Sequence, residues 1–170
     1  MAPPTQGGAP GESGMERPVR RVAVALGSNL GDRASHLAFA ADELRLVLQD
    51  VVVSTLMETL PEDGTPQPLF LNGALVGLTR EGPERLLAVL LDIEQRRGRV
   101  RSYTGAPRTL DLDLVLVGAM MVESSTLCLP HPRFRSRSFV LEPLAEIAPT
   151  MVDPVTGLSV RTLLERLRHP

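Results

Sequence analysis

The sequence predicts an α+β fold: a ferredoxin-like antiparallel sheet with helices packed on it. The main observation is the order of the apolar segments, which reads strand, helix, strand, strand, helix, strand. The second is composition, because 43% hydrophobic and 22% charged residues in a chain of 170 are typical of one globular domain with its own core.

Three strands and one helix are expected in the first half of the chain. Residues 22–26, 51–57 and 70–79 are aliphatic or β-branched runs, which favour strands. A helix is expected from Ala34, behind Asp32 as N-cap, because apolar residues then recur at helical spacing. Residues 61–68 hold three prolines and a glycine, which indicates a loop.

The second half begins with Pro83 at the first turn of a helix that should end near Gly98. Strands are expected at 110–117, 120–123 and 139–141, and a last helix at 160–167. Residues 1–18 are rich in Pro, Gly and Ser, so we expect a disordered tail there and the folded domain at 19–170.

Charge and hydropathy exclude several classes of protein. A net charge of −2 provides no overall basic field, so neither nucleic acid nor a membrane surface is an expected partner. The longest apolar run, 114–122, is too short to cross a bilayer, and no leader segment opens the chain. We therefore expect a cytoplasmic monomer. Cys128, the single cysteine, is expected in the core.

Two aspartates form the sharpest local signal. Side chains alternate along a strand, so Asp111 and Asp113 share one face while Leu110, Leu112 and Leu114 share the other. Two neighbouring carboxylates repel each other unless a cation joins them, and Mg²⁺ usually takes one or two carboxylates together with phosphates. A bare Asp-x-Asp is more often only the wet side of an exposed strand.

The neighbouring arginines shift this balance toward phosphate chemistry. Five lie shortly before the aspartates: Arg96, Arg97, Arg99, Arg101 and Arg108. A guanidinium is a planar fork of donors that suits phosphate oxygens. For Arg96 and Arg97 the alternative is strong, since cations near a helix C-terminus favour the dipole.

Two further charged groups are candidates. Glu94 should lie at the edge of the core, facing the arginine loop, and we favour pairing with an arginine over a ligand contact. His131 stands between two prolines and close to Arg133, Arg135 and Arg137, a second cationic cluster suited to phosphate. The turn at 27–29 resembles a phosphate-binding turn only weakly.

Taken together, these segments resemble the hydroxymethyl-dihydropterin pyrophosphokinases. The similarity runs from Val22 to Pro149, and its most specific block is Pro107-Arg108-Thr109-Leu110-Asp111-Leu112-Asp113. The other landmarks, in chain order, are 25–32, 71–74, 98–101, 130–133 and 139–144.

The resemblance implies a ferredoxin-like fold with mobile catalytic loops. It also implies transfer of the terminal pyrophosphate of ATP to 6-hydroxymethyl-7,8-dihydropterin in folate biosynthesis, leaving AMP. The metal ligands for two Mg²⁺ ions would be Asp111 and Asp113, and the catalytic arginines Arg99 and Arg108. The implied nucleotide contacts are Glu94, Arg101, Leu114, His131 and Arg137; the implied pterin contacts are Thr59, Phe70, Asn72 and Phe139.

Departures from the family pattern leave two other functions open. Gly105 falls near a position where the family often has tryptophan. Tyr103 would then either replace the missing ring over the pterin or be an exposed tyrosine without a role. Leu91 stands where a glutamine often contacts the nucleotide, and Leu60 where a proline is usual. The alternatives are a non-catalytic nucleotide-binding relative and a two-metal nucleotidyltransferase.

Overall fold

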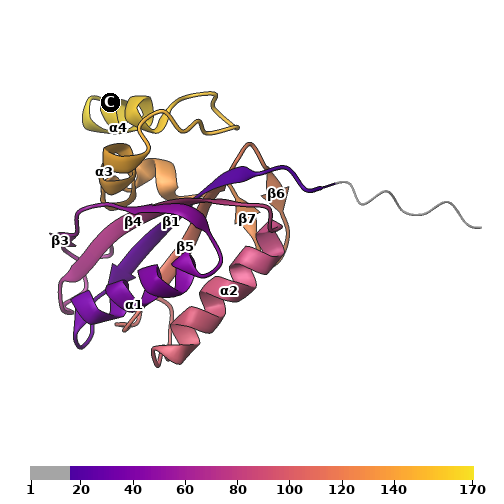
Figure 1. Cartoon of the computed structure of the whole chain (residues 1–170). Helices are drawn as coiled ribbons and strands as arrows, with labels where there is room; N and C mark the ends of the chain where they lie inside the picture. Colours follow the sequence, from indigo (N-terminus) through magenta and orange to yellow (C-terminus); the bar gives the residue numbers. More distant parts are fainter. Residues whose placement is uncertain (1–15) are drawn as a thin grey trace, which may run out of the picture.

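The computed structural model describes residues 16–170 (Figure 1). The predicted tail at 1–18 falls almost wholly outside the described residues, so it and the domain boundary remain predictions. The strands are β1 (Arg20–Ser28), β2 (Gln49–Val53), β3 (Met57–Thr59), β4 (Phe70–Thr79), β5 (Asp111–Val117), β6 (Val122–Glu123) and β7 (Cys128–Leu129). The helices are α1 (Arg33–Arg45), α2 (Pro83–Arg96), the short η1 (Phe134–Ser136), α3 (Ser138–Ile147) and α4 (Val160–Arg168).

The main sheet is antiparallel, with strand order β2-β4-β1-β5, and β3 also pairs with β4. Helix α1 connects β1 to β2 with β4 between them, and α2 connects β4 to β5 with β1 between them. Each connection is a split βαβ unit, so the predicted ferredoxin-like fold is confirmed.

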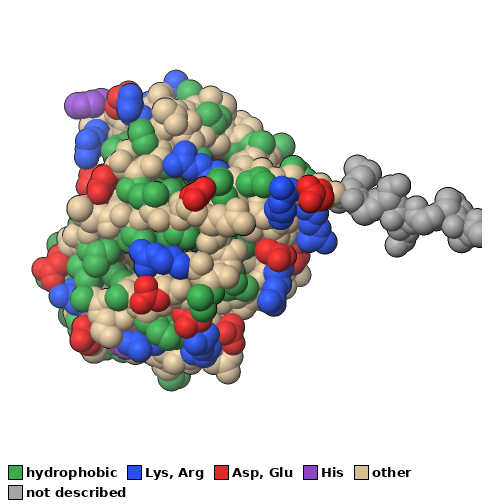
Figure 2. Space-filling model, viewed as in Figure 1, with side chains coloured by type: hydrophobic (Ala, Val, Ile, Leu, Met, Phe, Trp, Pro, Cys, Tyr) green, Lys and Arg blue, Asp and Glu red, His purple; other side chains and the backbone are tan. Residues whose placement is uncertain are grey.

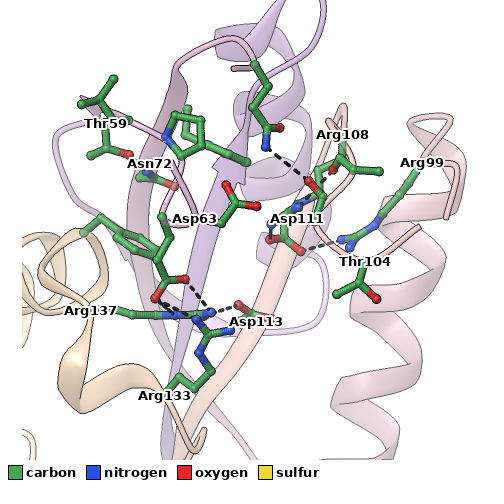
Figure 3. A pocket seen from close by; sticks show the side chains of 18 of the residues that line it. Thr59, Asp63, Asn72, Arg99, Thr104, Arg108, Asp111, Asp113, Arg133 and Arg137 are labelled. Carbon is green, nitrogen blue, oxygen red and sulfur yellow. Dashed lines mark hydrogen bonds and ion pairs between the residues drawn. The ribbon is translucent and has the colours of Figure 1, made fainter. Parts of the chain in front are cut away.

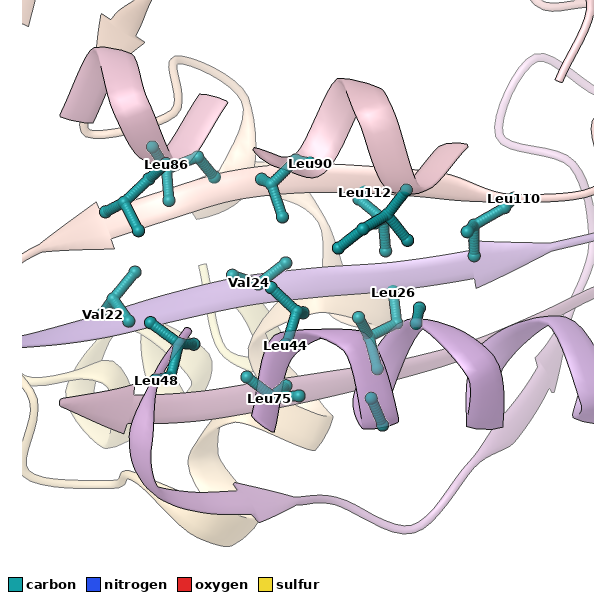
Figure 4. Packing of buried hydrophobic residues seen from close by; sticks show 14 of the residues in the cluster. Val22, Val24, Leu26, Leu44, Leu48, Leu75, Leu86, Leu90, Leu110 and Leu112 are labelled. Atoms are coloured by element: carbon teal, nitrogen blue, oxygen red, sulfur yellow. The ribbon is translucent and has the colours of Figure 1, made fainter. Parts of the chain in front are cut away.

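One face of the sheet is covered by α1 and α2. Val22, Val24 and Leu26 alternate along β1 toward this side, where they pack with leucines from both helices (Figure 4). Leu112 and Leu114 of β5 join the same cluster, as the alternation of the Asp-x-Asp segment predicts. Burial of each such side chain stabilises the fold by about 1.5–3 kcal/mol.

The other face carries α3 and α4. Small residues on this face, Ala23, Ala25 and Ala74, let the helices approach the sheet closely, and they share a core with Leu141 and Leu144. These helices cover only part of the face. Beyond Ala25, toward the end of β1, the sheet lines the cavity described below.

Three local expectations were wrong. Residues 139–141 lie in α3, not in a strand. The prediction failed because three residues are too few to reveal the helical spacing that buries Leu141 and Leu144. Residues 51–57 belong to two strands, β2 and β3, rather than one. Cys128 is exposed, since alternation in β7 turns Leu129 inward instead.

Charged groups are spread over the surface. On the face shown in Figure 2, acidic and basic side chains are interspersed rather than gathered into one basic area. Among residues 16–170, no helix has the length and apolar character needed to cross a membrane.

Candidate active site

A cavity of about 880 Å³ opens on the uncovered end of the sheet. Its walls come from the ends of β4 and β5, the loops at 59–67 and 99–108, and the segment from His131 to Phe139. All predicted site residues except Glu94 and Leu114 line it. The fold thus brings together groups that lie as much as 80 positions apart in the chain, Thr59 and Phe139.

Leu114, predicted to contact the nucleotide, does not line the cavity. Its side chain is 4% exposed and lies in the core beneath α1 and α2, on the face of β5 opposite the aspartates. The alternation that turns Asp111 and Asp113 toward the cavity necessarily turns Leu114 away from it.

Asp111 is held by two arginines. Its Oδ1 lies 2.6 Å from Arg99 Nη1, and its Oδ2 lies 2.8 Å from Arg108 Nη2 (Figure 3). Burial alone would raise the pKa of this carboxyl, but the guanidinium groups of Arg108 and Arg99 outweigh it and hold the pKa below its usual value.

Asp113 has a different environment. Its nearest basic groups are Arg137 Nη1 at 3.7 Å and His131 Nε2 at 3.8 Å, both beyond hydrogen-bond distance. Burial raises the pKa of Asp113, and the neighbouring Asp111 carboxylate raises it further. A cation bound by Asp111 and Asp113 together would therefore relieve the repulsion between the two carboxylates.

Glu94 lies behind the cavity and holds the start of the loop at 99–108. It is 3% exposed, and its Oε1 accepts hydrogen bonds from the Leu112 amide at 2.8 Å and from Arg99 at 2.6 Å. Its Oε2 accepts from Arg101 at 3.0 Å. Burial raises the pKa of Glu94 against the opposing effect of the Leu112 amide and Arg99. Both carboxylate oxygens therefore position arginines, which is the role favoured from the sequence.

Arg108 is fixed by a residue that sequence reasoning missed. Asn29, 1% exposed, accepts a hydrogen bond from the Arg108 amide at 2.8 Å, and the Asn29 amide donates to the Arg108 carbonyl at 3.1 Å. The Asn29 side chain also donates to Gln67 Oε1 at 2.8 Å. The turn at 27–29 was read only as a weak phosphate turn, whereas Asn29 ties both cavity loops to β1.

The other end of the cavity has amide and aromatic groups. The Asn72 amide donates to the Thr59 hydroxyl, and Phe70 lies beside them with Arg108 over its ring at 5.0 Å. Phe139 lines the same cavity, with Arg137 at 5.5 Å from its ring centre. Tyr103 lies at the rim and is 68% exposed.

The second cationic cluster is only partly in the cavity. Arg133 and Arg137 both reach Glu62, at 2.9 and 3.0 Å, a partner that the sequence did not indicate (Figure 3). Burial lowers the pKa of His131, and the nearby Asp113 carboxylate opposes this. Arg135 instead forms a bidentate pair with the buried Asp153, so its inclusion in the phosphate cluster was wrong.

Arg96 and Arg97 lie at the C-terminal end of α2, as expected if they favour the helix dipole rather than contact phosphate. Both lie over the ring of Phe39, at 5.2 and 4.8 Å, and Arg96 pairs with Glu43 at 2.7 Å. Neither lines the cavity, so of the five arginines before the aspartates only Arg99, Arg101 and Arg108 reach it.

Comparison with known proteins identifies this arrangement. The profile of the family described as 7,8-dihydro-6-hydroxymethylpterin-pyrophosphokinase matches residues 23–149, three quarters of the chain. The chain belongs to this family. The matched residues include every side chain that lines the cavity.

Bacterial relatives of the chain are similar to it over most of their length. The 2-amino-4-hydroxy-6-hydroxymethyldihydropteridine pyrophosphokinase of Methylorubrum extorquens is 41% identical over 149 residues, 86% of this chain and 93% of the relative. The enzyme of the same name from Synechocystis is 41% identical over 145 residues, 85% of this chain and 74% of the relative.

Other relatives are much longer. The chain covers 20% of the folic acid synthesis protein of Pneumocystis carinii, to which it is 39% identical over 147 residues. A crystal structure of a triple mutant of Plasmodium falciparum HPPK-DHPS superimposes on 89% of this chain and 44% of that one, with a TM-score of 0.72. At 14% identity, the latter similarity concerns the fold alone.

Proposed function

We propose that this pyrophosphokinase transfers the β,γ-pyrophosphoryl group of ATP to the hydroxymethyl oxygen of 6-hydroxymethyl-7,8-dihydropterin, in folate biosynthesis. The products are AMP and the pterin diphosphate. One observation carries the proposal: a single cavity has an amide and aromatic end at Asn72 and Phe70, and a carboxylate and arginine end at Asp111 and Arg108.

The pterin binds at the first end. A pterin is a flat ring with donors and acceptors along its edge, and it needs apolar walls with polar groups at the rim. The Asn72 amide offers both a donor and an acceptor, and the Thr59 hydroxyl orients it. Phe70 and Phe139 supply ring contacts.

Mg²⁺ would be held by Asp111 and Asp113, and the donor set fits it. Asp113 has no hydrogen-bond partner among residues 16–170, and each oxygen of Asp111 has a second lone pair beside its arginine. Arg108 Nε, buried and without a partner, is a further unused donor beside them. Bound there together with the nucleotide, Mg²⁺ would supply positive charge that offsets part of the charge on the phosphates.

The arginines act on the charge that moves. The pterin hydroxyl oxygen forms a bond to the β-phosphorus and loses its proton to solvent. The bond from that phosphorus to the α–β bridging oxygen breaks, and AMP leaves with that oxygen. Arg99 and Arg108, fixed by Glu94 and Asn29, stabilise the negative charge on the transferred group. Arg101, His131 and Arg137 contact the nucleotide.

Product analysis tests the proposal against both alternatives. The protein is incubated with MgATP and hydroxymethyl-dihydropterin, and nucleotides and pterins are separated by chromatography. We expect AMP and pterin diphosphate in equal amounts, and neither when the metal is chelated. Release of free pyrophosphate with a nucleotidylated product would indicate a nucleotidyltransferase, and no turnover a binding protein. A monomeric state and a cytoplasmic location remain predictions.

A further inference from the structure

Gly27 lies between the two ends of the cavity. In the sheet it is paired with Asn72 of β4 on one side and with Asp111 of β5 on the other. Directly paired residues point to the same face, so position 27 lies on the cavity side of the central strand, between the amide and the carboxylate.

The backbone does not require glycine at this position. Gly27 is not among the residues with positive φ, and β1 continues through it with regular pairing to both neighbours. In an extended strand interior, glycine weakens the strand because it has no side chain to pack. The reason for glycine must therefore be the space that a side chain would fill.

That space is bounded on three sides by groups of the cavity. A Cβ atom built at position 27 would lie 3.0 Å from Asn72 Oδ1, 3.8 Å from Asp111 Cβ and 3.8 Å from Phe70 Cδ1. Ala25, two residues earlier on the same face, carries a methyl group that packs under α3 in the second core. Along this face of β1, the side chain is therefore absent at the residue whose two pairing partners, Asn72 and Asp111, line the cavity.

We infer that Gly27 is a specificity-determining residue for the pterin, and this inference rests on the proposed function. Its bare backbone leaves open the shortest path from Asn72, at the ring edge, to the phosphates held near Asp111. The hydroxymethyl arm of the pterin crosses the sheet over Gly27, and the ring lies flat enough for Asn72 and Phe70 to contact it.

A methyl group at position 27 should weaken binding of the pterin but not of the nucleotide. At 3.0 Å it requires Asn72 Oδ1 to shift by a few tenths of an ångström, which displaces the amide that donates to the Thr59 hydroxyl. It also occupies the path of the arm. Its 3.8 Å contact with Asp111 is ordinary van der Waals distance, so the carboxylates and the nucleotide keep their places.

The test compares Gly27→Ala with Gly77→Ala. Gly77 is a matched control in β4: its added Cβ would lie 3.0 Å from Leu48 Cβ and 3.1 Å from the Gln49 carbonyl oxygen, outside the cavity. Titration calorimetry measures the affinity for a non-hydrolysable MgATP analogue, and then for the pterin with that analogue present. For Gly27→Ala we expect roughly 10- to 100-fold weaker pterin binding, with nucleotide affinity within about twofold. Gly77→Ala should lower only the melting temperature.

Three results would overturn the inference: pterin affinity unchanged in Gly27→Ala, nucleotide affinity lost in parallel, or an equal loss of pterin affinity in Gly77→Ala. If Gly27→Ala does not fold, the unmodified protein is titrated with a pterin that carries an extra methyl group on the arm carbon. If that analogue binds as tightly as the unmodified pterin, the inference that Gly27 limits the space for the arm would also be rejected. Failure of the unmodified protein to bind any pterin would count instead against the proposed function.

Discussion

Asp111 and Asp113 point to the same side of β5 but have opposite electrostatic surroundings. Burial favours a raised pKa for both carboxyls. For Asp111 the hydrogen-bonded guanidinium groups of Arg108 and Arg99 reverse the effect, whereas for Asp113 the Asp111 carboxylate adds to it. In the metal-free protein, one aspartate is therefore a structural partner of the arginines and the other a group under repulsion.

This difference predicts distinct effects for two substitutions that both abolish turnover. Asp113→Ala should leave the melting temperature unchanged or raise it, because it removes like-charge repulsion. Asp111→Ala should lower stability by about 1–3 kcal/mol, because it leaves Arg108 without its carboxylate. AMP formation and thermal denaturation without metal measure the two effects. Turnover of Asp113→Ala at the unmodified rate, in ordinary Mg²⁺, would exclude its role as a metal ligand.

Arg108 should contribute more to the rate than to nucleotide binding. It lies between the Phe70 ring at 5.0 Å and Asp111 at 2.8 Å, which puts it between the proposed pterin site and the proposed metal ligand. Loss of an interaction formed mainly in the transition state lowers kcat and kcat/KM together. We expect this pattern for Arg108→Ala, with partial recovery in Arg108→Lys. A rise in the KM for ATP alone would make Arg108 a ground-state contact.

The sequence allowed the fold and the carboxylate wall to be predicted because both depend on short-range spacing. Alternation along Thr109-Leu110-Asp111-Leu112-Asp113 assigns each side chain to a face without knowledge of its neighbours. The same rule turns the Leu114 side chain into the core, away from the cavity, whereas its nucleotide role was predicted from the resemblance alone. Where a segment is only three residues long, as at 139–141, strand and helix spacing cannot be distinguished.

The contacts that could not be predicted join residues far apart in the chain. Asn29 and Arg108 are 79 positions apart, and Glu62 and Arg137 are 75 apart. Neither Glu62 nor Asn29 stands in a pattern that indicates its partner, because polar residues in a loop or turn are usually solvated. Arg135 shows the converse: its sequence neighbours suggest phosphate, yet the chain turns it toward Asp153.

Asp153 predicts how stability depends on pH. It is fully buried, and burial would raise its pKa, but bonds from Arg135, Thr156 and the Val155 amide lower the pKa to about 2, below the ordinary 3.8. Its carboxylate therefore stabilises the fold above about pH 4, by about 2 kcal/mol, and this contribution is lost as pH falls toward 2.

Denaturant unfolding of Asp153→Asn across this pH range checks the assignment. The variant should be less stable than the unmodified protein at pH 6, and the difference should shrink as pH falls from about 4 to about 2. Asp42→Asn, at an exposed carboxylate paired with Arg45, is the control and should show little difference throughout. A stability difference for Asp153→Asn that is independent of pH would contradict the pKa shift.

Tyr103 should contribute to pterin binding when the catalytic loop closes. It is the only tyrosine, its side chain is 68% exposed at the cavity rim, and Gly105 nearby has no side chain to cover the ring. An aromatic contact contributes roughly 0.5–1.5 kcal/mol beyond area burial, or about 2- to 13-fold in affinity. Tyr103→Ala should weaken pterin binding by that factor, and Tyr103→Phe should restore it. Pterin affinity is measured by calorimetry with the nucleotide analogue present. An unchanged affinity in Tyr103→Ala would exclude this contribution.

Glu62 should compete with the phosphates of the nucleotide for Arg133 and Arg137. Its carboxylate bridges Arg133 at 2.9 Å and Arg137 at 3.0 Å, and both arginines line the cavity beside Asp113. A carboxylate and a phosphate make the same bidentate bonds with guanidinium groups, so phosphates can occupy this place only after Glu62 leaves it. Glu62 is 39% exposed, which limits the strength of the pair.

Glu62→Gln should therefore bind a non-hydrolysable MgATP analogue more tightly, by about 1.5- to 5-fold, the factor expected for a partly exposed ion pair. Glu58→Gln is the matched control, because Glu58 pairs with Arg33 outside the cavity and its loss should leave nucleotide affinity unchanged. The gain in Glu62→Gln should also decrease at high salt, since the competing pair is screened there. If Glu62→Gln binds the analogue more weakly than the unmodified protein, Glu62 positions the two arginines for phosphate rather than competing with it.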